Sequence, residues 1–333
     1  MISTFKSLVI REDNDKKFSR KIEEKKIDSL PKGEVLIEVK YSSLNYKDAL
    51  SASGNKGVTR NYPHTPGIDA SGIVAQSDND NFKEGDKIIV TGYDLGMNTS
   101  GGFGKFIRVP AEWIVKLPEN LSLRESMIIG TAGFTAAQSL ERLERIGMEQ
   151  SEESFVLITG ATGGVGSMAV TILKKAGYST AALTRKKDKA DYLKKLGAAK
   201  VIRAGELDTE SSKPLLSTKW RGVIDTVGGE ILSAAIRSTE YRGSVATCGN
   251  VLSPKFDITV FPFILRGVNL LGIDSAKCPM EPRLKIWEKL SGEWKPDNLD
   301  EIIDEIPLEE LSAKIDLMLE GKSSGRIVIN HDI

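Results

Sequence analysis

A glycine-rich turn in the middle of the chain has the residue types that bind phosphate groups. It reads Gly160-Ala-Thr-Gly163-Gly164-Val165-Gly166, follows the apolar run Phe155–Thr159, and precedes a segment typical of a helix. Glycines let the backbone approach a pyrophosphate closely, and a helix N-terminus presents N–H groups and a positive dipole end. The spacing is not Gly-x-Gly-x-x-Gly, but the order strand, turn, helix predicts a dinucleotide-binding unit. The expected contacts are Thr162, Gly163, Gly164 and Val165.

The next predicted strand discriminates between the two nicotinamide dinucleotides. It ends in Thr184-Arg185-Lys186, without an acidic residue at its tip. NAD-binding units usually place Asp or Glu here, where the carboxylate accepts hydrogen bonds from the adenine ribose. A 2′-phosphate would be repelled by a carboxylate, whereas these three side chains can donate to it and neutralise it. The sequence therefore predicts NADPH as the cofactor, and the alternative is a solvated basic turn that begins the next helix.

Residues 1–122 contain short runs rich in Val, Ile and aromatic residues, separated by Gly, Pro, Asn or Asp. This pattern predicts strands, and their spacing favours a small barrel over βαβ units. The expected strands are Phe5–Arg11, Glu34–Ser42, Ile68–Ala75, Lys87–Thr91 and Phe103–Val109.

Beyond residue 123 the pattern changes to strands that alternate with amphipathic helices, which predicts a doubly wound parallel sheet of the Rossmann type in an α/β protein. The expected strands cover 155–159, 180–184, 200–202, 222–225, 243–248 and 269–272, and the expected helices 124–145, 166–176, 187–196 and 231–238. Two helices, Pro282–Leu290 and Leu308–Glu320, and a closing strand, Gly325–Asn330, follow. We expect a mostly β catalytic domain over 1–122, a Rossmann domain over 123–272, and a segment over 273–333 that returns to the first domain.

The overall composition excludes several classes of function. Lys plus Arg and Asp plus Glu both number 46, so no net charge favours nucleic acid or an anionic membrane. The N-terminus lacks the pattern of a signal peptide and no apolar run approaches membrane-spanning length, so we expect a cytoplasmic protein. Two cysteines and two histidines are too few for a disulfide framework or a four-cysteine zinc site. We expect buried cysteines, a structural His64, a solvated His331 and no bound metal.

Three further segments, taken with the glycine turn, resemble the zinc-free quinone oxidoreductase branch of the medium-chain dehydrogenase/reductase superfamily. They begin at Ser42 (SSLNYKD), Pro66 (PGIDASG) and Ile128 (IIGTAGFTA). Four more, beginning at Asp225 (DTVG), Phe261 (FPFILR), Gly272 (GIDS) and Gly325 (GRIV), narrow the resemblance to the YhdH/YhfP-type group, which includes NADPH-dependent acrylyl-CoA reductases.

This resemblance implies a fold, a site and an assembly. The catalytic domain should be GroES-like, and the chain should form a homodimer through the Rossmann edge strand near Leu270-Leu271-Gly272. Zinc enzymes of the superfamily place ligands where Asn45-Tyr46 and Gly67-Ile68-Asp69 stand here, so both zinc sites should be absent. The implied cofactor contacts beyond the two motifs above are Tyr46, Thr131, Asn250, Ile264, Ser275 and Arg326.

Without a metal, the easiest reaction for a bound NADPH is conjugate reduction of an α,β-unsaturated carbonyl compound. Hydride reaches the β-carbon, and the carbonyl oxygen becomes an enolate that needs hydrogen-bond donors. Asn45 and Tyr46, at the end of a predicted strand, are the candidate catalytic residues; alternatively, they satisfy only local backbone groups. Asp48 and Asp69 could cap loop N–H groups. A short enoyl-CoA such as acrylyl-CoA is the leading substrate, and the alternatives are a quinone reductase of broad specificity and a non-catalytic NADPH-binding protein.

Overall fold

The computed structural model describes residues 4–151 and 153–333, which fold into two compact units. Unit 1 comprises Met1–Thr131, Ala276–Lys285 and Ile302–Ile333, and unit 2 comprises Ala132–Ser275 and Ile286–Glu301. The division differs from the expected one at residues 123–131, which belong to unit 1, and at residues 273–275 and 286–301, which belong to unit 2. The helices α2 (Leu123–Arg145) and α7 (Met280–Ser291) each contribute residues to both units.

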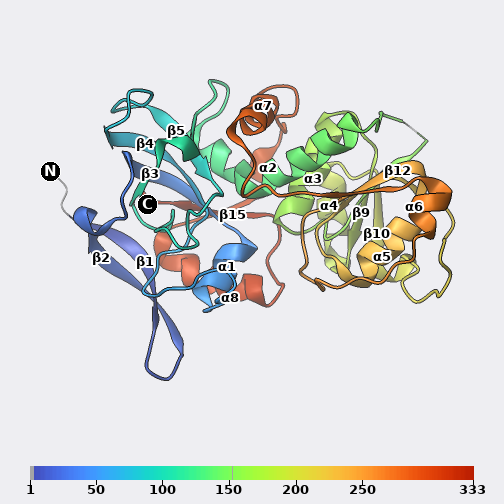
Figure 1. The fold of residues 1–333 in the computed structure, drawn as a ribbon, viewed down its shortest axis with the longest axis horizontal. Coiled ribbons are helices and arrows are strands. Elements are labelled where there is room, and N and C mark those ends of the chain that lie inside the picture. Colours follow the sequence, from blue (N-terminus) through green and yellow to red (C-terminus); the bar gives the residue numbers. More distant parts are fainter. Residues whose placement is uncertain (1–3, 152) are drawn as a thin grey trace. The chain divides into compact units, whose positions relative to one another are not determined.

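Unit 2 is built on a six-stranded parallel sheet in the order β10-β9-β8-β11-β12-β13, which is the Rossmann order (Figure 1). Its central strands are short and apolar because helices pack against both faces of such a sheet. The strands are β8 (Phe155–Ile158), β9 (Thr180–Thr184), β10 (Lys200–Arg203), β11 (Trp220–Asp225), β12 (Thr239–Thr247) and β13 (Asn269–Gly272). The helices are α3 (Gly164–Lys175), α4 (Ala190–Leu196), α5 (Gly229–Arg237) and α6 (Phe261–Arg266). The predicted doubly wound sheet is confirmed.

Unit 1 contains a seven-stranded sheet in the order β14-β15-β3-β4-β5-β7, with β6 paired to β3, and a separate hairpin of β1 and β2 (Figure 1). The strands are β1 (Thr4–Glu12), β2 (Phe18–Lys26), β3 (Val35–Leu44), β4 (Asp69–Ser77), β5 (Lys87–Thr91), β6 (Phe106–Val109), β7 (Ile114–Lys116), β14 (Ile303–Ile306) and β15 (Arg326–Asn330). The helices wholly within this unit are α1 (Tyr46–Ala52) and α8 (Leu311–Leu319). The closing strand β15 pairs with β3, so that Ile327 stands opposite Leu44.

The long helix α2 is interrupted at Gly130, whose φ of 49° and ψ of −160° are not helical. This conformation favours glycine because a Cβ would clash with the backbone. Gly130 lies one residue before the end of the first segment of unit 1, Met1–Thr131, and the helix restarts at Thr131. The kink turns the N–H of Thr131 away from the helix axis, and this group binds a carboxylate described below.

Both histidines hold one glycine-rich loop of unit 1. His64 Nε2 lies 2.9 Å from the carbonyl oxygen of Gly96, and His331 Nε2 lies 2.9 Å from that of Gly102. The structural role predicted for His64 is confirmed, and the solvated His331 was a wrong prediction. Burial lowers the pKa of His331 to about 4, because the charged imidazolium would lose its hydration.

Of the two cysteines, Cys278 is buried and Cys248 is partly exposed, and both are free thiols.

Within residues 4–151 and 153–333, no helix is long and apolar enough to cross a bilayer.

Candidate functional site

The predicted glycine turn of unit 2 links β8 to α3. Gly163 is the N-cap of α3, and Gly160 has a φ of 58°, which favours glycine. A Cβ on Gly166 would stand 2.3 Å from the carbonyl oxygen of Gly160, so only glycine lets α3 pack this closely on the turn. A Cβ on Gly163 would meet one atom within 4 Å, the carbonyl oxygen of Gly160 at 3.3 Å, and Gly163 itself is partly exposed. Thr162 is buried, whereas Gly163, Gly164 and Val165 are partly exposed.

A buried carboxylate fixes the ends of the strands that carry this turn. Asp225 ends β11 and is fully buried, and its Oδ1 accepts a 2.7 Å hydrogen bond from Thr159 Oγ1, next to the turn. Its Oδ2 accepts from the N–H of Gly228. Burial raises the pKa of Asp225, but these donors act in the opposite direction. Asp225 begins the DTVG motif, but nothing in the sequence indicates that its carboxylate holds the turn.

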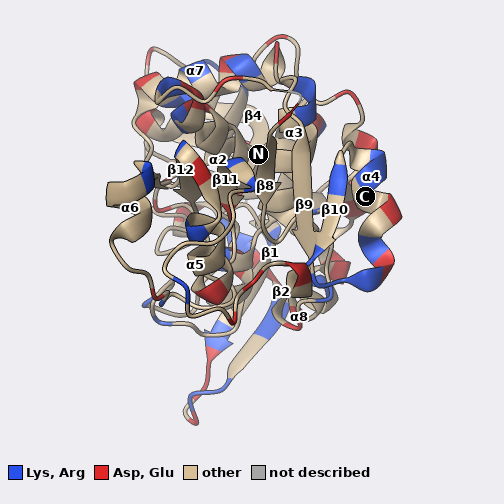
Figure 2. Ribbon diagram, turned by 90° about the vertical axis from the view of Figure 1, so that its right-hand side faces the viewer, with Lys and Arg blue, Asp and Glu red and all other residues tan. Residues whose placement is uncertain are grey.

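The basic tip of β9 also has the expected form. Thr184 is the last residue of β9, its Oγ1 accepts from the N–H of Lys186, and Arg185 is exposed. Desolvation and the neighbouring Lys189 lower the pKa of Lys186. Arg203 ends β10 directly opposite Thr184 in the parallel register, and Figure 2 shows blue ribbon gathered around β10 and α4. The sequence analysis missed Arg203, although the order β10-β9 places the two strand ends side by side.

The other contacts predicted in unit 2 fall into two groups. Asn250 follows β12, and its Cα would lie 3.4 Å from a Cβ on Gly228, in the loop that Asp225 holds. Asn250 therefore lies beside the loop that supports the glycine turn. Ser275 Oγ accepts a 2.7 Å hydrogen bond from Thr135 Oγ1 on α2. Ile264 lies on α6, which packs on β12, and its side chain is 67% exposed.

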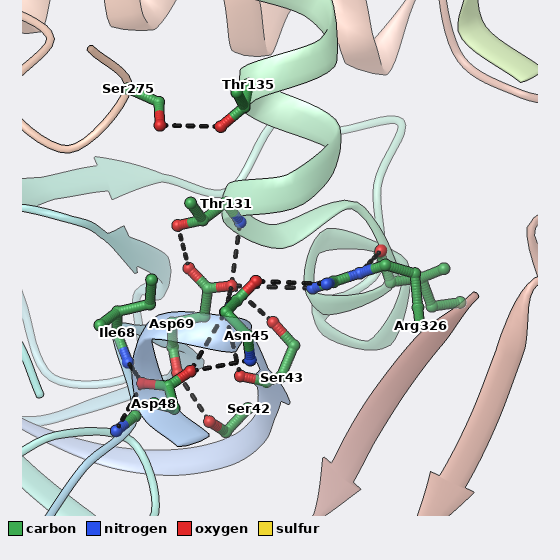
Figure 3. A network of polar contacts seen from close by, with 12 residues as sticks. Ser42, Ser43, Asn45, Asp48, Ile68, Asp69, Thr131, Thr135, Ser275 and Arg326 are labelled. Carbon is green, nitrogen blue, oxygen red and sulfur yellow. Dashed lines mark hydrogen bonds and ion pairs between the residues drawn. The ribbon is translucent and has the colours of Figure 1, made fainter. Parts of the chain in front are cut away.

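In unit 1, the side chains of Ser43, Asn45 and Thr131 converge on the carboxylate of Asp69, as Figure 3 shows. Asp69 begins β4 and is fully buried. Its Oδ1 accepts from Thr131 Oγ1 at 2.5 Å, and its Oδ2 accepts from the Thr131 N–H at 2.9 Å. The same Oδ2 accepts from Ser43 Oγ at 2.5 Å and from Asn45 Nδ2 at 2.8 Å. We call the residues Ser43, Asn45, Asp48, Asp69, Thr131 and Arg326 the Asp69 network.

Asn45 is held inside this network rather than presented to a substrate. Its Nδ2 also lies 3.3 Å from both the Ser43 carbonyl oxygen and Asp48 Oδ2, and its Oδ1 accepts from Arg326 NH1 at 3.2 Å. The two amide hydrogens thus have three acceptors within unit 1. These contacts favour the alternative, in which Asn45 organises the local backbone, and direct donation from Asn45 to an enolate stays a prediction.

Asp48 caps both the start of α1 and the loop before β4, as predicted. Its carboxylate accepts from the N–H groups of Asn45 at 2.9 Å, Gly67 at 3.1 Å and Ile68 at 2.8 Å. Burial and the nearby Asp69 raise the pKa of Asp48 to about 7, even though the three N–H donors favour the ionised form. Tyr46, the first residue of α1, projects from this cap with its side chain 37% exposed, which leaves it available to a ligand.

Arg326 lies inside the network, not at a surface. Only 2% of its side chain is exposed, its Nε donates to the carbonyl oxygen of Ile128 at 2.9 Å, and its NH2 lies 3.8 Å from Asp69 Oδ2. The predicted cofactor contact therefore finds no support in this geometry, because the guanidinium serves α2 and Asn45. Gly130 is essential to the arrangement: a Cβ there would lie 2.6 Å from Asp69 Oδ2 and 2.7 Å from Arg326 NH2.

The donor atoms in the described residues do not form a metal centre. No group of three or more His, Cys, Asp and Glu side chains within 4–151 and 153–333 is arranged to hold an ion. At the positions where zinc enzymes of the superfamily carry ligands, Asn45 has an amide side chain and Ile68 an aliphatic one. The carboxylate oxygens of Asp69 accept hydrogen bonds from four donors.

Two family models match this chain. The model described as the alcohol dehydrogenase GroES-like domain matches residues 31–119, and the one described as zinc-binding dehydrogenase matches residues 164–289. Each match lies mainly within one unit of the structure.

Individual relatives cover nearly the whole chain. "Putative quinone oxidoreductase YhfP" of Bacillus subtilis is 46% identical over 91% of this chain and 92% of its own. Its crystal structure with NAD bound superposes with a TM-score of 0.95, at 43% identity over 99% of this chain and all of that one. Acrylyl-CoA reductase AcuI of Ruegeria pomeroyi is 40% identical over 98% of this chain and 99% of its own.

A solved oxidoreductase adds a second structural match. The yhdH oxidoreductase of Salmonella enterica, crystallised with NADP, gives a TM-score of 0.94 at 37% identity and covers 98% of this chain and 99% of that one. Together with the GroES-like and Rossmann folds of the two units, these matches show that the chain belongs to the medium-chain dehydrogenase/reductase superfamily of oxidoreductases.

Proposed function

We propose that this oxidoreductase reduces the C=C bond of an α,β-unsaturated carbonyl compound with NADPH, and that a short enoyl-CoA such as acrylyl-CoA is its substrate. The observation that carries the cofactor assignment is the tip of β9, where Thr184, Arg185 and Lys186 stand in place of an acidic residue. The substrate assignment rests on the likeness to AcuI, which is named an acrylyl-CoA reductase.

The residues of unit 2 fit a dinucleotide. The turn at Gly163 and the N-terminus of α3 would receive the pyrophosphate, since Gly163 and Gly164 carry no side chain and are partly exposed. Arg185 and Lys186 would bind the 2′-phosphate, and Arg203 would add a third positive charge beside Thr184. When bound, NADPH supplies the hydride that the β-carbon accepts.

In unit 1, Tyr46 is the residue we propose to be catalytic. Its exposed phenol can donate a hydrogen bond to the carbonyl oxygen as negative charge develops there. Thr131 would contact the cofactor through its side chain or backbone, and the Asp69 network would hold both residues in place. Asn45 keeps a role as the cap of α1, not as a donor to the substrate.

Reduction of a quinone is the second candidate. It is favoured by one observation, the likeness to YhfP, which is named a quinone oxidoreductase and was crystallised with NAD. Both reactions use a hydride donor and a site without a metal, so the fold does not distinguish them.

A stopped-flow comparison of NADPH oxidation tests the proposal. The acceptors are acrylyl-CoA, crotonyl-CoA, a simple enone and a benzoquinone, each at several concentrations. We expect the highest kcat/KM with acrylyl-CoA, and Tyr46→Phe should lower kcat on the order of 10²-fold, as loss of one oxyanion donor does. Turnover confined to the quinone would establish the second candidate, and turnover of none of the four would refute both.

A homodimer and a cytoplasmic location stay predictions. The edge strand β13 carries Leu270, and Val260, Phe261, Ile264 and Leu265 on or beside α6 expose much of their apolar surface. An open apolar edge strand invites pairing with a second copy, which would also cover these side chains. The exposure of Ile264 suits this surface better than a contact with the cofactor. Light scattering at micromolar concentration measures the assembly, and a monomer would contradict it.

A further inference from the structure

Asp69, at the start of β4, joins the adjoining ends of β3 and α1 to the kink of α2, which lies far away in the sequence. Its carboxylate receives donors from Ser43 at the end of β3, from Asn45 at the cap of α1, and from Thr131 just after the kink of α2. Both of its oxygens are engaged, and the side chain is fully buried. Asp69 therefore fixes the place where α1 begins and the place where α2 restarts.

This arrangement is more elaborate than fold stability requires. A buried carboxylate loses its hydration, and its only cation in the network, Arg326, approaches no closer than 3.8 Å. Arg326 NH2 makes no hydrogen bond within the described residues, so this ion pair lacks a direct hydrogen bond. A buried pair of this kind contributes little net stability, and its effect lies in the geometry that it imposes.

The hydrogen bonds of Asp69 determine the positions of two residues in the proposed function, Tyr46 and Thr131. Tyr46 is the first residue of α1 and follows the cap Asn45, whose amide Asp69 holds at 2.8 Å. Thr131 is bound to Asp69 through both its N–H and its hydroxyl. One carboxylate thus sets the positions of the proposed oxyanion donor and of a proposed cofactor contact.

We propose that Asp69 is a positioning residue for hydride transfer, which acts through Asn45 on Tyr46 and directly on Thr131. This inference rests on the proposed function. It requires the shape of the carboxylate more than its charge, because four short hydrogen bonds define it and the cation is distant. A displacement of about 1 Å in such a support can cost on the order of 10²-fold in rate.

Two substitutions separate shape from charge. Asp69→Asn keeps the length of the side chain and one acceptor oxygen, and the Thr131 hydroxyl can turn to accept from the new amide. Asp69→Glu keeps the charge but is longer by one methylene, so it must push Thr131 and Asn45 apart. We expect Asp69→Glu to lower kcat about 100-fold and Asp69→Asn about tenfold, with the KM for NADPH within threefold of the wild-type value in both.

The matched control is Ser51→Ala, which removes a buried hydrogen bond from the same helix α1, the 2.6 Å contact between Ser51 Oγ and Thr59 Oγ1. It should lower the thermal midpoint without changing kcat by more than about twofold. If Ser51→Ala lowers kcat as much as Asp69→Glu at equal loss of stability, the role of Asp69 is only structural and the inference is wrong.

A readout without turnover keeps the inference independent of the reaction. In the protein without cofactor, amide hydrogen exchange over residues 46–52 and 131–135 should speed up in Asp69→Glu, less in Asp69→Asn, and over 46–52 alone in Ser51→Ala. The fluorescence of bound NADPH should change in the same order. Wild-type protein that reduces no acceptor would refute the proposed function. The positioning role would be refuted if Asp69→Glu left both the hydrogen exchange and the NADPH fluorescence unchanged. It would also be refuted if kcat were lower in Asp69→Asn than in Asp69→Glu.

Discussion

The two units build their polar sites in opposite ways. In unit 2 the glycine turn presents backbone groups, its residues are consecutive from Gly160 to Gly166, and its shape follows from the absence of side chains. In unit 1 the Asp69 network is made of side chains from positions between 43 and 326, all of them partly or fully buried. A backbone site is specified locally and can be found in a sequence, whereas a side-chain network exists only once distant segments have packed together.

The glycine that the network needs gives the largest expected effect on stability. Gly130→Ala adds a Cβ within 2.7 Å of Asp69, Arg326 and Ser43 atoms, at a φ of 49°. Strain and overlap together should cost about 3–5 kcal/mol of unfolding free energy. Gly147→Ala is the matched control, because Gly147 has a φ of 97° but nothing within 4 Å, and should cost about 1–2 kcal/mol. Urea unfolding measures both, and equal costs would show that the network tolerates displacement.

Acid should weaken unit 1 through His331. Its pKa is about 4 in the folded chain and about 6.5 when unfolded, so the unfolded chain binds the proton first as the pH falls. This contribution to the free energy of unfolding is therefore complete above pH 6.5. It falls by about 2–3 kcal/mol as the pH decreases from 6.5 to 4. His331→Gln can keep the hydrogen bond to Gly102 without titrating, so it should remove this part of the pH dependence. A wild-type and variant difference that stays constant with pH would contradict the assignment.

Titration of Asp48 should change the free energy of unfolding in the opposite direction, over nearly the same pH range. Its pKa is raised to about 7, so the folded chain holds this proton more tightly than the unfolded chain, and stability is lost as the pH rises from about 4 to 7. The two groups partly offset each other in the wild type. For this reason the His331→Gln comparison has to be made as a difference at each pH and not read from one profile.

Cofactor choice tests the basic tip of unit 2. We expect the wild type to prefer NADPH over NADH at least roughly tenfold in kcat/KM, because one charge-assisted contact contributes about 1.5–3 kcal/mol. Arg185→Ala should raise the KM for NADPH about tenfold and leave that for NADH nearly unchanged. Lys187→Ala, in the same exposed turn, serves as the control and should change neither. Equal use of both cofactors by the wild type would contradict the interpretation, and the NAD-bound structure of YhfP makes this measurement informative.

The sequence predicted the parallel sheet and the glycine turn because both depend on neighbouring residues. It missed β2, because charged residues occupy most positions of this strand and none of its residues is buried, so no apolar alternation marks it. It also did not predict the network around Asn45 and Arg326, since nothing local shows that Asp69 lies within reach of both. The hydrogen bond of the partly buried His331 has the same cause: only the packed chain places Gly102 beside it.

Metal removal should have the smallest effect of all. Dialysis against EDTA should leave activity unchanged, and elemental analysis should find well under one zinc per chain. Zinc in proteins takes thiolate, imidazole and carboxylate ligands in fixed sets of three or four. The two cysteines belong to different units, and burial and Asp225 raise the pKa of Cys248 to about 12, which opposes the thiolate. Asp69 would have to release four hydrogen bonds to bind an ion, and its neighbours Asn45 and Arg326 present N–H groups that repel one. One zinc per chain that survives dialysis, with activity lost when it is stripped, would show that the Asp69 network rearranges around a metal and would overturn the contrast between the two sites.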